Sequence, residues 1–221
     1  MISPPLILYV SPGACSRVAL TGLEESGLPY EARAVALMTG QQRQPEYLAL
    51  NPKGKVPLLV TPDGPLSENV AIASWLDAQA PQAGLLPPAG AVWARTQALS
   101  WLVWSVSTLH PMIYRMRMTP RIHPDASTHA AIKAAALAEL TQQLAVAEDA
   151  LADGRPWLTG EAWRIGDAHV CWVFGRGIDG GLDATAFPRL AGLAACHAER
   201  PAFQRALAQE AASASTPRNT T

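Results

Sequence analysis

The sequence predicts an α/β domain followed by an all-helical domain, because two contrasting stretches follow one another along the chain. In the first stretch, short apolar runs that end in turn residues alternate with a helical pattern, as in a β-α-β unit with parallel strands. In the second, the chain is rich in alanine, and its apolar residues recur at helical spacing without a convincing strand. We therefore expect an α/β domain over residues 1–82, a linker over 83–91, an all-helical domain over 92–212 and a disordered tail over 213–221.

The α/β domain begins with the β-α-β unit. Residues 6–10 form an apolar run ended by Ser11-Pro12-Gly13, which predicts a buried strand and a turn. Helical spacing predicts a helix over 16–26, which Gly27 and the proline after it would end. The remaining predicted elements are a second strand at 31–37, a hairpin of strands at 56–60 and around Leu66 joined by Asp63-Gly64, and a helix that starts with Ser67 as its N-cap.

The second half is expected to be entirely helical. A boundary error of ~2–4 residues applies to each element. The predicted helices span about 92–118, 127–152, 167–177, 188–199 and 201–212.

Charge and length exclude several classes of function. The 221 residues carry 17 Lys+Arg against 18 Asp+Glu, so there is no electrostatic footprint for nucleic acid or a membrane surface. No apolar stretch reaches the ~18–20 residues that span a bilayer, and the start of the chain lacks an export signal. Three cysteines favour a reducing compartment over a disulfide framework. We expect a cytoplasmic protein with neither nucleic-acid nor membrane partners.

Cys15 lies where the first predicted strand and turn lead into a helix. Unpaired N–H groups and the dipole at a helix start favour negative charge, so we expect a Cys15 thiolate to be stabilised. The alternative is a small buried residue at a helix cap. The spacing is not Cys-x-x-Cys, which excludes an internal dithiol exchange. Cys171 and Cys196 fall on apolar faces of predicted helices, where a core role is favoured.

Two other segments could bind a ligand. The proline after Val56 requires a sheet edge, a strand start or a cis bond. With Pro57 in a cis bond, the Val56 backbone could pair with an extended peptide, although an ordinary edge-strand proline is the simpler alternative. The N–H groups of Glu68 and Asn69 could receive a carboxylate and Glu68 could accept an ammonium group, as an amino acid requires. Plain N-capping by Ser67 is the alternative.

Together these segments resemble the N-terminal motifs of the glutathione S-transferase superfamily, most closely its bacterial beta class. The resemblance is strong to about residue 80, extends more loosely over the rest of the chain, and implies a thioredoxin-like domain, an all-helical domain and a homodimer. The matching segments are Tyr9-Val10-Ser11-Pro12-Gly13-Ala14-Cys15-Ser16, Asn51-Pro52-Lys53-Gly54-Lys55-Val56-Pro57 and Ser67-Glu68-Asn69-Val70-Ala71-Ile72.

The resemblance also implies roles for single residues. Cys15 matches the active-site cysteine, and Val56, before a cis Pro57, matches the residue whose backbone pairs with glutathione. Glu68 and Asn69 match the γ-glutamyl site. The other matched positions are Ser67, the hydroxyl of that motif; Lys53, near the glycine end; and Ser107 and His110, which face the ligand in the beta class and share one face of a predicted helix.

The chain departs from the family pattern at several positions. Val103 and Pro111 stand where the beta class has Asn and Lys, which removes two polar contacts to the ligand. A lysine expected near residues 40–41 is missing, and Gln41 or Gln42 could replace its hydrogen bond but not its charge. Arg164 occupies a Ser/Thr capping position, so one helix cap worth ~1 kcal/mol is expected to be lost.

The resulting hypothesis is an enzyme that activates the thiol of glutathione, its co-substrate, for attack on an electrophilic small molecule, without a metal. Cys15, Ser11 or Ser16 would assist the thiolate. Alternatively, Cys15 forms a mixed disulfide with glutathione in thiol transfer or peroxide reduction. A binding protein without catalysis is a third hypothesis. The electrophile would occupy an apolar cleft between the domains, for which Trp104, Tyr114 and Met112 are candidate lining residues or, equally, core residues.

Overall fold

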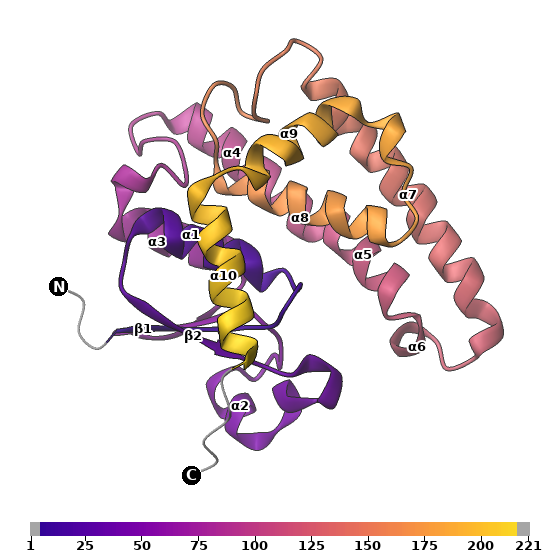
Figure 1. Ribbon diagram of the computed structural model, residues 1–221, viewed down its shortest axis with the longest axis horizontal. Coiled ribbons are helices and arrows are strands. Elements are labelled where there is room, and N and C mark those ends of the chain that lie inside the picture. The colour runs from indigo at the N-terminus through magenta and orange to yellow at the C-terminus, as the bar shows by residue number, and fades with distance from the viewer. Residues whose placement is uncertain (1–4, 216–221) are drawn as a thin grey trace. The chain divides into compact units, whose positions relative to one another are not determined.

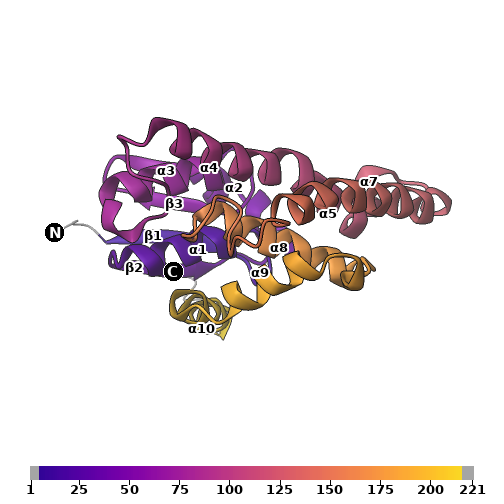
Figure 2. The ribbon, with the colours of Figure 1, turned by 90° about the horizontal axis from the view of Figure 1, so that it is seen from above.

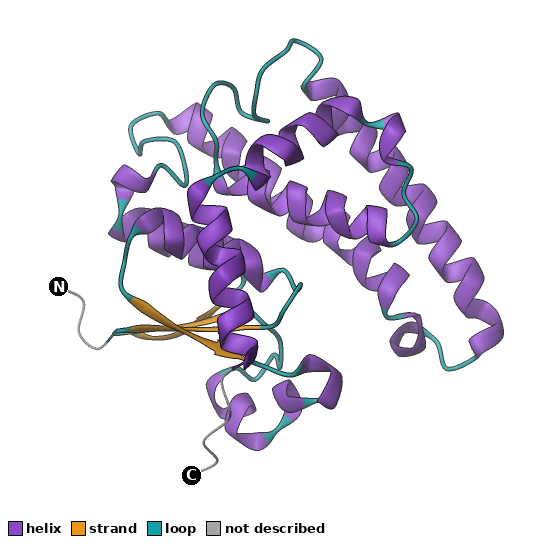
Figure 3. Ribbon diagram, viewed as in Figure 1, coloured by secondary structure: helices purple, strands orange, loops and turns teal. Residues whose placement is uncertain are grey.

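The structure, a computed structural model, describes residues 5–215 and divides into two compact units. One comprises the chain up to Leu85 together with the residues from Glu199 onward, and the other is Leu86–Ala198. Strands occur in the first unit, whereas the described part of the second is helical (Figure 3). An α/β fold followed by an all-helical fold is therefore confirmed. No helix within residues 5–215 is long and apolar enough to cross a membrane.

The first unit is built on a four-stranded mixed sheet. Its strands are β1 (Leu6–Val10), β2 (Tyr30–Ala34), β3 (Leu58–Thr61) and β4 (Gly64–Ser67), in the order β2-β1-β3-β4. β1 and β2 are parallel, as predicted for a β-α-β unit, and β3 runs antiparallel to both β1 and β4. Leu8, at the centre of the sheet, lies opposite Ala32 on one side and Leu59 on the other.

Helices cover the sheet. In Figure 1, α1 (Ser16–Ser26) and α3 (Asn69–Gln79) lie together on one side of it and α2 (Pro45–Leu50) lies on the other. Gly27 ends α1 in the left-handed conformation with φ of 66°, as predicted. The shorter 3-10 turns are η1 (Leu37–Thr39), η2 (Gln41–Arg43) and η3 (Pro81–Ala83). Fully buried leucines and an isoleucine form the core between helices and sheet: Leu6, Leu8, Leu20, Leu23, Leu59 and Ile72.

Three local predictions for this unit differ from the structure. The second strand ends at Ala34, because the chain then turns into η1 and η2, which were not predicted. The strand expected from Val56 starts at Leu58, after a cis Val56–Pro57 bond. The prediction of Ser67 as N-cap is wrong. Ser67 is the last residue of β4 and pairs with Leu58 of β3, and the N-cap of α3 is Glu68, which makes no side-chain capping bond.

The C-terminal helix belongs to the first unit, although the sequence assigned it to the helical domain. α10 (Pro201–Ser215) packs against α1 and β2, and it extends three residues into the expected tail; residues 216–221 of that tail lie outside the described residues. Arg17 and Glu210 join α1 to α10 with an Nη2–Oε2 distance of 2.5 Å. Two more ion pairs reach α1: Arg205 of α10 pairs with Glu24, and Arg200, immediately before α10, pairs with Glu25.

The second unit is a set of packed helices. Its core contains the fully buried Leu109, Leu140, Leu144, Val170 and Val173. In chain order the elements are α4 (Val92–Trp104), the π-helical segment η4 (Ser105–Leu109), α5 (His110–Arg117), α6 (Thr119–Ile122), η5 (Ala126–Thr128), α7 (His129–Ala150), α8 (Ile165–Asp179), η6 (Ala184–Ala186) and α9 (Pro188–Ala198).

The helix predicted over 92–118 is interrupted by η4, although α4 and α5 follow one another end to end (Figure 2). Pro111 explains the interruption. It has no N–H to donate to the carbonyl four residues back, and its ring would clash with that carbonyl in a regular α-helix. The chain widens locally, and the His110 N–H donates to the Ser105 carbonyl in an i to i−5 bond.

The start of α8 compensates for the arginine at its cap. As expected, the Arg164 side chain does not cap the helix; its Nη1 donates to the Leu86 carbonyl at 3.3 Å instead. Asp167 supplies the other half of the cap, since its carboxylate accepts from the Arg164 N–H at 2.7 Å and from the Leu158 N–H at 2.9 Å.

We predict that Glu210→Ala destabilises the first unit by about 3 kcal/mol, since it leaves the Arg17 charge without its buried partner. The two side chains are 25% and 6% exposed, so solvent screens the pair only weakly. The expected decrease in Tm is roughly 6–12 °C, measured by circular dichroism. Glu46→Ala, which removes an exposed carboxylate of the same unit, should cost less than about 1 kcal/mol. Equal decreases for the two variants would contradict the prediction.

Candidate active site

The turn between β1 and α1 is closed by a side chain. The Ser16 hydroxyl accepts from the Ser11 N–H at 3.0 Å and donates to the Ser11 carbonyl at 3.4 Å. The Ala14 N–H donates to that same carbonyl at 2.9 Å. Ser16 is fully buried, so its hydroxyl holds the turn and presents Cys15 at the start of α1.

Cys15 contacts two other predicted site residues. Its Sγ lies 3.7 Å from the Val56 carbonyl, to which the thiol donates, and the Asn69 side-chain amide donates to the Cys15 carbonyl at 3.2 Å. The thiol is buried, and burial raises its pKa to about 12, an effect that the Asn69 amide only partly offsets. The expectation of a stabilised Cys15 thiolate is therefore wrong, because desolvation outweighs the favourable field at the helix start.

Two side chains hold the loop before Pro57 in place. The Tyr47 hydroxyl and the Asn51 amide both donate to the Lys55 carbonyl, each at 2.7 Å. Gly54 adopts a φ of +58°, and a Cβ there would come within 2.9 Å of the Gln42 carbonyl oxygen, which explains the glycine. The Val56 side chain packs into a small core cluster, while its N–H has no hydrogen-bond partner within the described chain.

Glu68 and Asn69 adjoin Cys15 at the start of α3. Glu68 has a φ of 79°, a left-handed value that is costly for a residue with a side chain. Its exposed carboxylate pairs with Lys53, with an Nζ–Oε1 distance of 2.9 Å. Asn69 is buried, and its Oδ1 has no partner among the residues described. The structure thus brings Cys15, Val56 and Asn69 together and places Lys53 against Glu68.

Comparison with known proteins decides the family. The family model of the glutathione S-transferase N-terminal domain matches residues 13–79. Glutathione S-transferase GstA of Escherichia coli O157:H7 is 33% identical over 205 residues, which make up 92% of this chain and 98% of that protein. The chain belongs to the glutathione S-transferase superfamily.

Solved transferase structures share the fold. A glutathione transferase homologue from Sulfitobacter with bound glutathione superimposes with a TM-score of 0.83 at 28% identity, over 93% of this chain and 97% of that one. The beta-class enzyme of Sphingomonas chungbukensis gives a TM-score of 0.81 at 29% identity, over 92% of this chain and 98% of that one. The family and fold that the N-terminal motifs indicated are confirmed.

Gln41 and Gln42, near the position where a lysine was expected, make hydrogen bonds to the backbone of their own loop. Gln41 Oε1 accepts from the Ala36 N–H at 2.8 Å, and Gln42 Nε2 donates to the Leu37 carbonyl at 3.4 Å. Both amides therefore stabilise η1 and η2. Their expected hydrogen bond to a ligand remains a prediction.

Ser107 and His110 of the transferase pattern lie in the helical unit. Ser107 is exposed within η4, and His110, half-buried, begins α5. The His110 ring contacts Trp172 at a centroid distance of 4.6 Å and His169 at 5.6 Å. Their role in ligand binding remains a prediction, as does that of the residues in the first unit.

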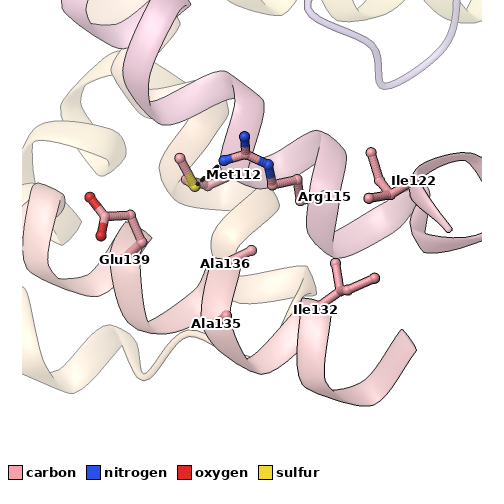
Figure 4. Close-up of a pocket in the computed structure, with 7 residues that line it drawn as sticks. All are labelled: Met112, Arg115, Ile122, Ile132, Ala135, Ala136 and Glu139. Atoms are coloured by element: carbon pink, nitrogen blue, oxygen red, sulfur yellow. Dashed lines mark hydrogen bonds between the residues drawn. The ribbon is translucent and has the colours of Figure 1, made fainter. Parts of the chain in front are cut away.

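The residues suggested for an electrophile cleft have different surroundings. Trp104 packs on the helical core and donates from Nε1 to Gln143, while Tyr114 is 42% exposed. Met112 lines a pocket of about 500 Å³ between α5, α6 and α7, with its side chain beside that of Arg115 (Figure 4). The other residues that line it are Ile122, Ile132, Ala135, Ala136 and Glu139.

The sequence did not reveal a buried serine–histidine pair in the helical unit. Ser105 Oγ lies 2.7 Å from His169 Nδ1, and both residues are fully buried. A histidine within an apolar helix was the available signal, but its partner is 64 positions away. No group of three or more His, Cys, Asp or Glu side chains that could hold a metal ion occurs among residues 5–215; absence of a metal remains a prediction.

Cys15 and Cys196 should differ in their rates of alkylation. At pH 7.5 we expect iodoacetamide to label exposed Cys196 at least about tenfold faster than Cys15, because a pKa of about 12 leaves little Cys15 thiolate. Cys15 labelling should increase about tenfold per pH unit below that pKa, for as long as the protein stays folded. Peptide mass spectrometry of the native protein measures both rates, and equal rates would contradict burial of the thiol.

Cys196 does not have the core role expected for it, whereas Cys171 is half-buried against the core.

Proposed function

We propose that this protein is a glutathione S-transferase that binds glutathione in extended form and activates its thiol for attack on an electrophilic small molecule. The observation that supports this most directly is the convergence of Cys15, Val56 and Asn69 at one end of the sheet. The named relative from E. coli and the homologue with bound glutathione support the same function.

The site offers a partner to each part of a thiol tripeptide. The unpartnered N–H of Val56 can pair with the backbone of the cysteinyl unit, as an added strand would. The Glu68 carboxylate can accept the γ-glutamyl ammonium group, and the α3 N-terminus can receive the adjacent carboxylate. Asn69 Oδ1, buried without a partner, is a further acceptor. Lys53, already paired with Glu68, would lie between the charged ends of the ligand.

Cys15 acts in this proposal as a hydrogen-bond donor. With its pKa raised to about 12, the thiol keeps its proton at neutral pH. In this proposal the proton that the Val56 carbonyl accepts in the structure is donated instead to the glutathione sulfur when the tripeptide binds. That bond favours the glutathione thiolate over the thiol, and the thiolate then forms a bond to the electrophilic carbon as the leaving group departs. A mixed disulfide would need the Cys15 thiolate as nucleophile, which burial disfavours. Ser16 closes the turn, so Ser11 is the remaining hydroxyl candidate.

The helical unit contributes to the same reaction in this proposal. Ser107 and His110 match ligand-facing positions of the beta class, and His110 is a candidate general acid or electrostatic partner for the departing group. Val103 and Pro111 supply no polar contact at two positions where the beta class has one. We propose that the electrophile is correspondingly apolar.

We predict that Cys15→Ala lowers kcat for conjugation of a chlorinated nitroaromatic by less than about tenfold, since one neutral hydrogen bond is lost. Cys15→Ser keeps a donor and should stay within about twofold of the wild type. Steady-state absorbance assays at saturating glutathione measure both variants. If conjugation were abolished equally in both, Cys15 would be a nucleophile and the donor role would be wrong.

We predict that Glu68→Gln raises KM for glutathione about tenfold with little change in kcat, because it removes the negative charge that faces the ammonium group in ground state and transition state alike. Calorimetric titration with glutathione should give a parallel loss of affinity. Glu46→Gln, an exposed carboxylate elsewhere in the same unit, serves as the matched control and should leave both values unchanged. Absence of glutathione binding by the wild type at millimolar concentration would contradict the proposed function.

We also propose a homodimer located in the cytoplasm. Besides the family resemblance, the first turn of α4 supports a dimer, since Trp93 and Val92 are 73% and 69% exposed in the single chain. Light scattering should give about twice the mass of one chain. A mass of one chain across the micromolar range would contradict the dimer.

A further inference from the structure

The peptide group between Lys55 and Val56 is held by two buried side chains at the end of α2, the helix on the opposite side of the sheet from α1 and α3 (Figure 1). Tyr47 lies within α2, and Asn51 is its C-cap residue. The Tyr47 hydroxyl and the Asn51 amide each donate to the Lys55 carbonyl at 2.7 Å, which uses both lone pairs of that oxygen. The Lys55 side chain is exposed, so only its main chain takes part in these contacts.

Packing fixes the positions of both donors. Tyr47 and Asn51 are 6% and 3% exposed, and burial raises the pKa of the Tyr47 hydroxyl to about 12, so it remains a donor at neutral pH. The Tyr47 ring lies edge-on to Tyr9 at a centroid distance of 5.6 Å and belongs to the same core cluster as Val56. Asn51 Oδ1 accepts from the Lys53 N–H at 3.2 Å, which sets the plane of its amide. The two donors therefore determine where the Lys55 carbonyl lies.

The other end of this peptide group is the Val56 N–H. The cis bond of the loop follows Val56, so the Lys55–Val56 bond is trans, and its N–H and C=O point in opposite directions. With the carbonyl directed at Tyr47 and Asn51, the N–H is directed away from both. The Val56 carbonyl accepts from the Cys15 thiol and the Val56 side chain packs into the core, whereas the N–H has no partner among the residues described.

We propose that Tyr47 and Asn51 are positioning residues for glutathione: through the Lys55 carbonyl they aim the Val56 N–H at the backbone carbonyl of the cysteinyl unit and strengthen it as a donor. A peptide group whose carbonyl accepts hydrogen bonds is polarised, which strengthens a bond from its N–H by roughly 10–30% for each bond accepted. A donor that is already in place also lowers the ordering cost of binding. This inference rests on the proposed binding of glutathione, and neither Tyr47 nor Asn51 touches the ligand in it.

The first test is spectroscopic. Lys55–Val56 is the one Lys-Val pair in the sequence, so protein labelled with ¹³C-carbonyl lysine and ¹⁵N-valine gives a single coupled ¹³C–¹⁵N signal. A carbonyl that loses a hydrogen bond resonates upfield, and Tyr47→Phe should therefore move the Lys55 carbonyl signal upfield. Asn51→Ala, which also releases the Lys53 N–H, should move it in the same direction. Glutathione should move the Val56 amide proton downfield in the wild type and less in Tyr47→Phe.

The second test measures binding and turnover. Tyr47→Phe should raise KM for glutathione and its calorimetric Kd roughly threefold with kcat unchanged, because a hydrogen bond to the ligand is weakened in ground state and transition state alike. Tyr30→Phe is the matched control, since the Tyr30 hydroxyl donates to Glu24 within the same unit. A purely structural role of Tyr47 would lower Tm, as loss of the Tyr30 hydroxyl does, without moving KM or the labelled signal. Tyr30→Phe should leave KM and that signal unchanged.

The outcomes separate this inference from the proposed function. Normal glutathione affinity and a normal Val56 response in folded Tyr47→Phe would overturn the positioning role and leave the proposed function standing. Absence of glutathione binding by the wild type would overturn both, and the labelled signal of the free protein would still show whether Tyr47 holds the peptide group. If Tyr47→Phe does not fold, Asn51→Ala decides by the same measurements.

Discussion

The hydrogen bonds between Ser16 and Ser11 are the constraint on which the candidate site depends. They close the turn at the end of β1 and thereby set where α1 starts, with Cys15 as its cap. Once this turn is fixed, the Cys15 thiol lies against the Val56 carbonyl, and the Cys15 carbonyl accepts a hydrogen bond from the Asn69 amide. Three segments far apart in sequence are thus joined through the main chain and side chain of one residue.

Burial decides the chemistry available at Cys15. A helix start typically stabilises a negative charge by 0.3–1 kcal/mol, about 2 kcal/mol in favourable cases. The increase in the Cys15 pKa from 9.0 to about 12 corresponds to about 4 kcal/mol against the thiolate, so desolvation is the larger effect. A protonated thiol beside a bound sulfur can donate a hydrogen bond and leaves the negative charge on the substrate. The same residue type at the same position would be a nucleophile if the site were open to water.

Much of the first unit could be predicted from sequence because its signals are local. The run at 6–10, the helix ended by Gly27 and the Asp63-Gly64 hairpin each depend on a few adjacent residues. The features that were missed depend on distant partners or on competition between effects. The assignment of α10 to the first unit follows from Arg17 meeting Glu210, 193 positions apart. Similarly, Ser105 gains a role only through His169, and η4 arises because Pro111 cannot donate within a helix.

Glu68 shows why candidate site residues could be identified from the sequence more easily than their positions in the helices and strands. A serine before two polar residues is a common helix start, yet Ser67 completes β4 and the chain turns at Glu68 with a φ of 79°. For a residue other than glycine this conformation costs of order 1–3 kcal/mol, and the backbone at α3 would be relieved by a glycine. A glycine would, however, remove the carboxylate that pairs with Lys53. A strained glutamate at the start of α3, the helix start proposed to face the ligand, is therefore more readily explained by the charge it presents than by stability.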